Sequence, residues 1–303
     1  MENKKVAIII STYNGEKYLE EQLDSIINQT YENLLIYIRD DGSSDNTRKI
    51  LERYRSLDSR IQVEFAQNIG YCRSFFSMLE KVEADYYAFC DQDDIWKSTK
   101  ISIAIKDIEN KERGQGTFPV LWFSNIELCD AEMNLITLAS IKKFYTFENS
   151  LFTCAAPGMA MVINKEARKK IISKNIDTIK EHDFWVYRVC SALGEIVYNK
   201  EALVKYRRHG NNVSDYSYNF LQRYYLGFKR LFLTDIYKNT KKEIILFSKL
   251  YRDNLSEEKK KTIELFSDYH LKARIRKTFF NKRLKDNPIN EILIRVLLLF
   301  GGI

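Results

Sequence analysis

The first 96 residues carry three buried strands that each end in a cluster of polar side chains, and this pattern constrains the fold most. Each strand is a short apolar run, as expected for a strand covered on both faces of a sheet. The runs are Val6–Ile10, Leu34–Ile38 and Tyr86–Cys90, and the clusters that follow them are Ser11–Gly15, Arg39–Asp45 and Asp91–Asp94. Helical periodicity separates the strands, which predicts an α/β fold with a mostly parallel sheet. Because parallel strands deliver their C-terminal ends to one edge, we expect the three clusters to meet there.

Further elements follow from the same periodicities. Strands are predicted at Ile61–Phe65, Val120–Phe123 and Gly158–Asn164, and helices at Glu16–Gln29, around Ile50 to Tyr54, and at Tyr71–Val82, Glu166–Ser173 and His182–Leu193. From about Tyr218 onward the pattern is helical, with aromatic residues interleaved with Lys and Arg. We therefore expect a domain over residues 1–217 and a basic, amphipathic helical appendage over residues 218–303.

Asp91, Asp93 and Asp94 place three carboxylates within four residues. Like charges at this spacing repel each other unless hydrogen-bond donors or a cation compensate them. Mg²⁺ and Mn²⁺ accept ligands of this kind and often share them with the oxygens of a bound diphosphate. The cluster therefore predicts a divalent metal site, with an acidic loop or helix cap as the alternative.

The net charge of +7 is concentrated toward the C-terminus. From Leu221 to Ile303 there are 19 Lys and Arg against 9 Asp and Glu, a balance of +10, which leaves −3 for the first 220 residues. A basic tail on a mildly acidic body indicates an anionic partner, either membrane lipid or nucleic acid, or else a solvated helical face.

The cysteines and the hydropathy pattern predict a cytoplasmic protein. The five cysteines are widely spaced, and no Cys-x-x-Cys pair occurs, so neither a zinc site nor a disulfide framework is indicated. The first strand follows Met1 with no signal peptide before it, and no run of 18 uncharged apolar residues occurs.

Taken together in this order, the clusters resemble the motifs of family 2 glycosyltransferases. The matching phrases are Ser-Thr-Tyr-Asn-Gly from Ser11, Arg-Asp-Asp-Gly-Ser-Ser-Asp from Arg39 and Asp-Gln-Asp-Asp-Ile-Trp from Asp91, and the likeness continues through Glu181–Trp185 and Tyr206–Asn212. The resemblance implies the GT-A fold of nucleotide-diphospho-sugar transferases and an inverting, metal-dependent sugar transfer. Two features depart from the pattern: Asn125 stands where many relatives have Asp, and Cys154–Gly158 is not a Thr-Gly-rich turn.

The resemblance also assigns the donor site. Tyr13 is expected to pack on the nucleotide base, and Asp41 to accept a hydrogen bond from the imide nitrogen of a pyrimidine, which favours uridine or thymidine. Arg73 is expected to reach the base or the diphosphate, and Asp91 the ribose. The full set of implied donor contacts comprises Ser11, Thr12, Tyr13, Asp41, Arg73, Asp91 and Arg207.

The implied chemical residues are Asp93, His209 and Asp183. Asp93 is expected to bind Mg²⁺ or Mn²⁺, and His209 to complete the metal shell or to bond a phosphate oxygen. Asp183 is expected to act as the catalytic base that takes the proton from the acceptor hydroxyl. The alternative for Asp183 is a helix cap, and in either case a helix N-terminus keeps its carboxylate ionised.

Within the family, the phrases Ser-Thr-Tyr-Asn-Gly-Glu, Asp-Gln-Asp-Asp-Ile-Trp, His-Asp-Phe-Trp and Tyr-Arg-x-His resemble streptococcal polysaccharide rhamnosyltransferases. This likeness implies dTDP-L-rhamnose as the donor, a lipid-linked glycan as the acceptor, and a place in cell-wall or capsule synthesis. UDP-hexoses stay open as donors, because Asp41 does not distinguish uracil from thymine.

Four other functions fit the sequence less well. A nucleotide-sugar pyrophosphorylase needs a Gly-rich basic loop after its first strand, and a dehydrogenase needs a Gly-x-Gly-x-x-Gly turn, and both are absent. A non-catalytic sugar-nucleotide-binding protein would not need Asp93, Asp183 and His209. A nucleic-acid reader would use aromatic residues as stacking platforms, whereas here they recur at helical spacing beside Leu and Ile.

The apolar run Ile289–Ile303, interrupted by Glu291 and Arg295, is too short to span a bilayer but suits the membrane interface. With the basic cluster Lys272–Lys285, it predicts that the appendage docks on the anionic inner face of the cell membrane. A homodimer contact or packing on the first domain is the alternative use of these helices.

Overall fold

The computed structural model describes residues 4–114, 116–139, 144–172, 176–209 and 236–301, and it divides into two compact units. Unit 1 comprises Met1–Ile141, Ala156–Asp177 and Glu181–His209, and unit 2 comprises Lys142–Ala155, Thr178–Lys180 and Gly210–Ile303. The boundary predicted between residues 217 and 218, and the predicted start of the appendage at Tyr218, lie outside the described residues.

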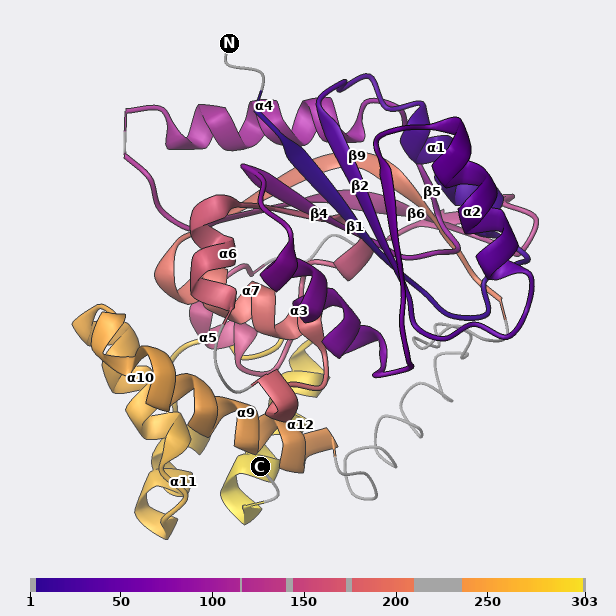
Figure 1. Ribbon diagram of the computed structural model, residues 1–303. Coiled ribbons are helices and arrows are strands. Elements are labelled where there is room, and N and C mark those ends of the chain that lie inside the picture. The colour runs from indigo at the N-terminus through magenta and orange to yellow at the C-terminus, as the bar shows by residue number, and fades with distance from the viewer. Residues whose placement is uncertain (1–3, 115, 140–143, 173–175, 210–235, 302–303) are drawn as a thin grey trace. The chain divides into compact units, whose positions relative to one another are not determined.

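Four parallel strands form the first half of the sheet in unit 1, in the order β3-β2-β1-β4. They are β1 (Val6–Thr12), β2 (Leu34–Asp40), β3 (Ile61–Phe65) and β4 (Tyr86–Cys90). Figure 1 labels β1, β2 and β4 of this group. The register pairs Thr12 with Asp40 and Ile10 with Cys90, so β1, β2 and β4 end at the same edge. The predicted α/β pattern is confirmed, and β3 and β4 have the bounds expected from the sequence.

The second half of the sheet is mixed, which makes the whole sheet less parallel than the sequence indicated. β8 is antiparallel to both β4 and β6, whereas β9 is parallel to β6 and antiparallel to β5. The strands are β5 (Ile95–Trp96), β6 (Val120–Cys129), β7 (Leu135–Leu138), β8 (Met161–Asn164) and β9 (Glu195–Arg207). β9 was not predicted, because Lys200 and Glu201 interrupt its apolar pattern.

Helices cover both faces of this sheet, and its core is apolar. Right-handed crossover connections place α1 and α2 on one face of the sheet and α3 on the other face. Helices α6 and α7 pack on the same face as α3. The bounds are α1 (Leu19–Ile27), α2 (Thr47–Leu57), α3 (Tyr71–Lys81), α4 (Lys100–Glu112), α6 (Lys165–Ile171) and α7 (His182–Leu193), with a 3₁₀ turn at Gly158–Ala160. α7 has the predicted bounds and carries the predicted catalytic base.

Unit 2 is helical, as predicted for the described residues from Ile236 onward. Its helices are α5 (Phe147–Ser150), α9 (Ile236–Tyr251), α10 (Glu257–Ser267), α11 (Leu271–Thr278) and α12 (Pro288–Phe300), with a 3₁₀ turn at Arg252–Asn254. A further 3₁₀ turn, Ile176–Thr178, begins in unit 1 and ends at the first residue of the unit 2 segment Thr178–Lys180. Buried Asn149 joins α5 to the C-terminal segment, donating from Nδ2 to the Leu284 carbonyl at 3.0 Å. Among the described helices of the whole chain, none has the length and apolar character needed to cross a membrane.

Candidate active site

The polar clusters that follow β1, β2 and β4 lie together at one edge of the sheet, as predicted. The Tyr13 backbone N–H donates to Gln92 Oε1 at 2.8 Å, and Gln92 Nε2 donates to the Tyr13 carbonyl at 3.1 Å. The Asn14 N–H donates to Ser43 Oγ at 2.9 Å. Gly15 makes this approach possible, since a Cβ there would lie 2.4 Å from Gln92 Oε1. A ligand at this edge therefore meets residues of all three clusters.

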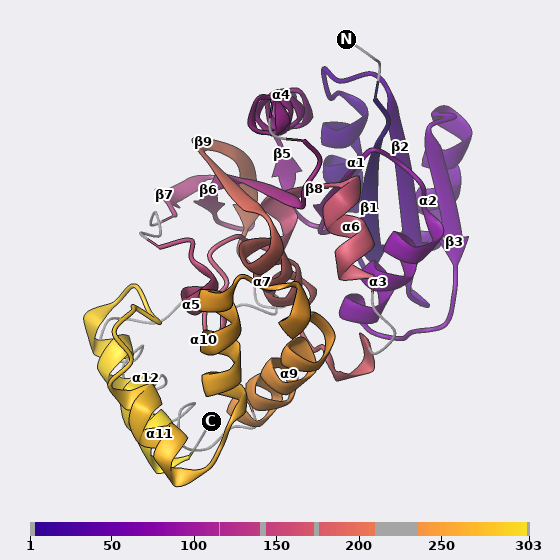
Figure 2. The same cartoon turned by 90° about the vertical axis from the view of Figure 1, so that its left-hand side faces the viewer.

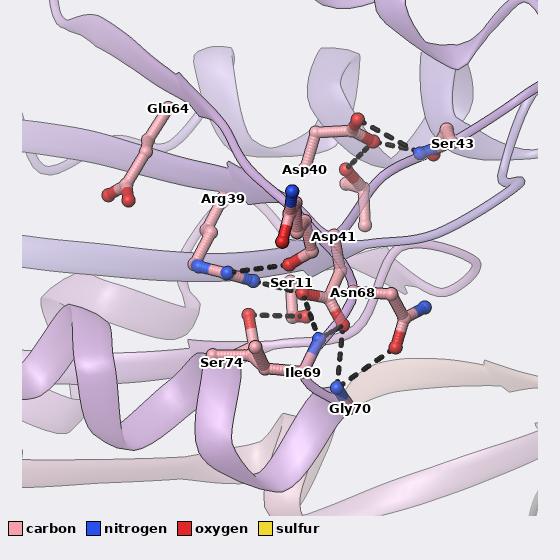
Figure 3. Close-up of polar contacts among 12 residues, drawn as sticks. Ser11, Arg39, Asp40, Asp41, Ser43, Glu64, Asn68, Ile69, Gly70 and Ser74 are labelled. Atoms are coloured by element: carbon pink, nitrogen blue, oxygen red, sulfur yellow. Dashed lines mark hydrogen bonds and ion pairs between the residues drawn. The ribbon is translucent and has the colours of Figure 1, made fainter.

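Asp40 joins the first two clusters from inside the protein (Figure 3). Thr12 Oγ1 donates to Asp40 Oδ1 at 3.1 Å, and the Ser43 hydroxyl and N–H donate to the same carboxylate at 2.5 and 3.1 Å. Thr12 and Asp40 are fully buried. The structure therefore does not bring the Thr12 hydroxyl to the nucleotide side, because this hydroxyl points inward onto Asp40.

Asp41 lies at the centre of a second set of bonds (Figure 3). Its carboxylate accepts from the Ile69 N–H at 3.0 Å and from the Gly70 N–H at 2.8 Å, and it also pairs with the Arg39 guanidinium. Arg39 in turn donates to the Gln67 carbonyl at 3.0 Å. Because Asp41 is only 2% exposed, a pyrimidine imide would have to share the carboxylate with these donors. In this state Asp41 holds the loop that precedes α3.

Three of the expected donor contacts keep accessible surface at this edge. Tyr13 is 50% exposed, and half-buried Ser11 donates from Oγ to Ser74 Oγ at 2.8 Å. The exposed Arg73 guanidinium pairs with Asp177 at 3.1 Å. An exposed ion pair of this kind contributes little to stability, so Arg73 can exchange Asp177 for a phosphate at small cost.

The two expected metal ligands, Asp93 and His209, are in direct contact. His209 Nε2 lies 2.8 Å from Asp93 Oδ2, and the imidazole ring packs 5.0 Å from the Tyr18 ring. Within the residues that the structure describes, no group of three or more His, Cys, Asp or Glu side chains is arranged to hold a metal ion. The carboxylate of Asp93 suits Mg²⁺ or Mn²⁺, which often combine one or two protein carboxylates with phosphate oxygens and water. The imidazole of His209 lies where it would reach such an ion or a phosphate oxygen.

Asp91 links the metal pair to the predicted base. Burial raises the pKa of Asp91 to about 7, and the nearby negative charges of Asp93 and Asp183 contribute to this rise. The three carboxylates therefore share one site, although Asp183 is distant from the other two in the sequence. Such a concentration of acids favours binding of a cation and of hydroxyl groups that can donate hydrogen bonds.

Arg207 is buried beneath the loop that carries Asp93. It is 2% exposed, and its guanidinium donates to the Asp93 carbonyl at 2.9 Å, the Ala131 carbonyl at 2.5 Å and the Glu21 carboxylate at 2.7 Å. It also stacks over the Tyr18 ring at 4.4 Å. These partners engage all sides of the buried guanidinium, so the expected phosphate contact of Arg207 is not supported.

Lys100 is a residue of the site region that the motifs did not reveal. It is fully buried, lies 3.1 Å over the Trp96 ring, and donates from Nζ to the Met159 carbonyl at 2.9 Å. Burial disfavours the charged forms of both Lys100 and Asp94, so it lowers the pKa of Lys100 well below its ordinary value and raises the pKa of Asp94 well above its own. Helical periodicity is the available signal, because Lys100 falls on the same face of α4 as buried Ile101 and Ile108.

Asp183 lies in the first turn of α7, as predicted for a base held at a helix N-terminus. The Phe184 N–H donates to Asp183 Oδ1 at 2.8 Å. Gly158 flanks it on the other side, since a Cβ at Gly158 would lie 3.6 Å from the Asp183 Cβ and 3.0 Å from His182 Nε2. The turn at Gly158 and the start of α7 therefore form the wall around the predicted base.

His182 supports this wall as a buried, neutral imidazole. Its ring stacks on Phe75 at 4.3 Å and on Phe89 at 5.4 Å, and within the described residues neither ring nitrogen has a hydrogen-bond partner. Burial lowers its pKa from the ordinary 6.5 to about 3. Between these values the unfolded chain binds one more proton than the folded chain, so acid favours unfolding.

We expect the His182→Gln variant to lose this acid sensitivity. In the parent protein the free energy of unfolding should fall with decreasing pH, from pH 6.5 toward 3, by as much as about 1.4 kcal/mol per unit from this residue. Urea unfolding at a series of pH values measures both proteins. Parallel pH profiles for parent and variant would show that His182 is not the group responsible.

Curated relatives align with most of the sequence of this chain. A glycosyltransferase of Haemophilus influenzae whose activity is uncharacterised is 31% identical over 88% of this chain and 91% of its own length. The dTDP-rhamnosyl transferase RfbG of Shigella flexneri is 31% identical over 71% of this chain and 76% of its own length. The family model described as glycosyl transferase family 2 matches residues 7–148.

Solved structures show the same fold. S. aureus TarS 1–349 in complex with UDP-GlcNAc superposes with a TM-score of 0.61 at 16% identity, covering 97% of this chain and 81% of TarS. The mannosyltransferase PcManGT from Pyrobaculum calidifontis, in complex with GDP-Man and Mn²⁺, has a TM-score of 0.54 at 14% identity and covers 99% of this chain and 86% of its own. The mixed sheet with its flanking helices is the GT-A fold, and this chain belongs to glycosyltransferase family 2.

Proposed function

We propose that this glycosyltransferase inverts the anomeric centre of L-rhamnose as it moves the sugar from dTDP-L-rhamnose to a lipid-linked glycan. The observation that carries the proposal is the meeting of Asp91, Asp93 and Asp183 with His209 at the edge of the sheet. At this edge, Asp93 and His209 would bind a cation that neutralises the diphosphate, and Asp183 provides the carboxylate that accepts a proton from the acceptor. The rhamnosyl donor is supported by the likeness to RfbG.

The donor occupies the side of the site formed by the β1 and β2 clusters. Tyr13 presents an exposed ring for the base, and Ser11 and Arg73 keep accessible polar groups for the nucleotide and the diphosphate. Asp41 orders the loop beside the base through Ile69 and shares its carboxylate with a pyrimidine imide. Asp91 receives the ribose hydroxyls, which donate to its carboxylate.

Asp93 and His209 would hold Mg²⁺ or Mn²⁺ beside the diphosphate of the donor. The fit rests on the contact between a carboxylate oxygen of Asp93 and an imidazole nitrogen of His209 at 2.8 Å. When bound, the ion supplies positive charge that compensates the departing nucleoside diphosphate. Arg207 keeps Asp93 in place by binding its backbone carbonyl at 2.9 Å.

Asp183 takes the proton of the acceptor hydroxyl as the acceptor oxygen attacks the anomeric carbon. The bond from that carbon to the diphosphate breaks on the opposite face, so the anomeric configuration inverts. Asp183 lies in the first turn of α7, where the helix dipole favours a negatively charged side chain. A lipid-linked acceptor places this reaction at the inner face of the cell membrane, with the enzyme bound peripherally.

A UDP-hexose is the second candidate donor, favoured by the UDP-GlcNAc complex of TarS. A non-catalytic protein that only binds sugar nucleotides would have the same pocket without turnover. Release of free sugar from the donor in the presence of Mn²⁺ separates an enzyme from such a protein.

Calorimetry with a panel of donors tests the proposed sugar. We expect dTDP-L-rhamnose to bind about tenfold or more tightly than UDP-glucose or UDP-GlcNAc, a difference of about 1.4 kcal/mol. Free dTDP and UDP serve as the control and should bind equally, since the imide contact is common to both bases. Tighter binding of a UDP-hexose would refute the rhamnosyl donor and leave the fold assignment untouched.

A further inference from the structure

Helices α11 and α12 of unit 2 each expose a stripe of large apolar side chains. On α11 and its C-terminal cap the stripe has a spacing of four residues, and on α12 the spacing is three to four, so each stripe follows one helix face. The most exposed members are Phe279 at 80% and Phe300 at 75%. The full set comprises Leu271, Ile275 and Phe279 from α11 and Ile289, Ile292, Val296 and Phe300 from α12.

The two charges that interrupt the apolar sequence of α12 are engaged inside unit 2. Glu291 is 5% exposed and accepts from the Leu284 and Lys285 N–H groups at 2.9 and 2.6 Å. Arg295 pairs with Glu291 at 2.6 Å and donates to the Thr278 carbonyl at 2.7 Å. The exposed stripe of α12 therefore carries no charge, which the sequence did not indicate.

Helices α11 and α12 pack side by side (Figure 2), and their packing brings the two stripes into one surface. Arg274 of α11 donates to the Leu299 carbonyl at 3.1 Å, and Thr278 donates to the Arg295 carbonyl at 3.5 Å, so the helices are antiparallel. On both helices, the residues buried in the core and those of the stripe lie on opposite sides of this line of contact. For antiparallel helices, this arrangement turns both stripes toward the same side, away from the core of unit 2.

The border of this surface is basic. From Leu271 to Phe300 there are eight Lys and Arg and two acidic residues, Asp286 and Glu291. Lys272, Arg276 and Arg283 are exposed, and in the described part of the chain none has an acidic partner within ion-pair distance. An uncharged apolar face with cations at its edge complements a bilayer with anionic headgroups, because apolar side chains enter the acyl boundary while Lys and Arg meet phosphate.

We propose that the α11–α12 surface, defined by these seven apolar side chains, inserts into the headgroup region of an anionic membrane. Lys272, Arg276 and Arg283 bind the lipid phosphates around it. The inference deepens the proposed function, on which it rests for its purpose, because a membrane-bound enzyme reaches a lipid-linked acceptor. It commits to a lipid surface, since a contact between two copies would bring the same unpaired cations together.

Sedimentation with lipid vesicles tests the surface on the full-length chain. We expect the parent protein to bind vesicles of phosphatidylcholine mixed with phosphatidylglycerol, and the double variant Phe279→Ser/Phe300→Ser to bind about a hundredfold more weakly. The matched control is Leu57→Ser/Leu135→Ser, which removes two exposed apolar side chains from unit 1, at 72% and 60% exposure, and should bind as the parent does. All four positions are exposed, so these variants should fold.

The cations are tested separately with Lys272→Gln, Arg276→Gln and Arg283→Gln. Each should weaken binding to the anionic vesicles by about fivefold and leave the weaker binding to pure phosphatidylcholine unchanged. Calorimetry measures donor binding by the parent and by every variant, and this measurement tests the proposed function separately. A parent protein that does not bind the donor would overturn the proposed function but not the membrane surface.

Three results would overturn the membrane surface. These are a parent protein that ignores anionic vesicles, a Phe279→Ser/Phe300→Ser variant that binds them as the parent does, and a parent dimer that this variant converts to a monomer. The last result would identify the surface as a contact between two copies of the chain.

Discussion

Replacing Asp93 by asparagine is expected to lower the rate of sugar transfer by about a thousandfold or more, while the protein stays folded. The asparagine side chain keeps the size of the aspartate and a hydrogen bond to His209, but it removes the negative charge that attracts the divalent ion. Stabilisation of a leaving diphosphate by a bound ion contributes several kcal/mol, and each 1.4 kcal/mol is about a factor of ten in rate. Transfer assays with Mn²⁺, Mg²⁺ and a chelator measure the effect.

The matched control is Asp85→Asn, which makes the same chemical change at the opposite end of β4. Asp85 accepts from the Lys5 N–H at 2.9 Å and lies far along the strand from the metal pair. It should retain transfer activity, and both variants should show the circular dichroism of the parent. Full activity of Asp93→Asn, or of the parent after removal of all divalent metal, would contradict the metal assignment.

Replacing Asp183 by asparagine should lower turnover by about a hundredfold or more and leave donor affinity nearly unchanged. Asparagine cannot take the proton of the acceptor hydroxyl, and loss of a positioned base costs on the order of a hundredfold to ten-thousandfold in rate. Donor binding does not use this proton transfer. The turnover number from transfer kinetics and the donor dissociation constant from calorimetry measure the two effects independently.

Glu181→Gln is the control for Asp183, because it removes a carboxylate at the same end of α7. Glu181 accepts a hydrogen bond from the Tyr71 hydroxyl, and the glutamine oxygen can still accept it. This variant should keep most of the turnover. Unchanged turnover of Asp183→Asn, or a loss confined to donor affinity, would contradict the assignment of Asp183 as the catalytic base.

Several local elements of unit 1 could be predicted from the sequence. The bounds of β3 and β4 follow from short apolar runs with polar ends, and those of α7 from helical periodicity, because backbone geometry links these patterns to strand and helix. The convergence of the three polar clusters also follows, since parallel strands must end at one edge. Asp93 and His209, chosen from motifs, lie in contact.

Contacts between distant segments were decided by the tertiary structure alone. β9 has an irregular sequence pattern, but it pairs along the length of β6. The hydrogen bonds and packing that β6 provides stabilise the strand more than its own pattern indicates. Lys100 became part of the buried site region because α4 carries it against Met159, 59 residues farther along the chain.

The same division applies to the functional residues. The sequence by itself determined which residue types stand at the ends of the strands, and hence the chemistry available there. Only the tertiary structure decided which of these side chains face a ligand: Thr12 is turned onto Asp40, and Arg207 is buried against Glu21 and the Asp93 carbonyl. The physical reason is that a motif specifies a side chain, whereas its orientation depends on the buried partners that satisfy its hydrogen bonds, and those partners come from distant parts of the chain.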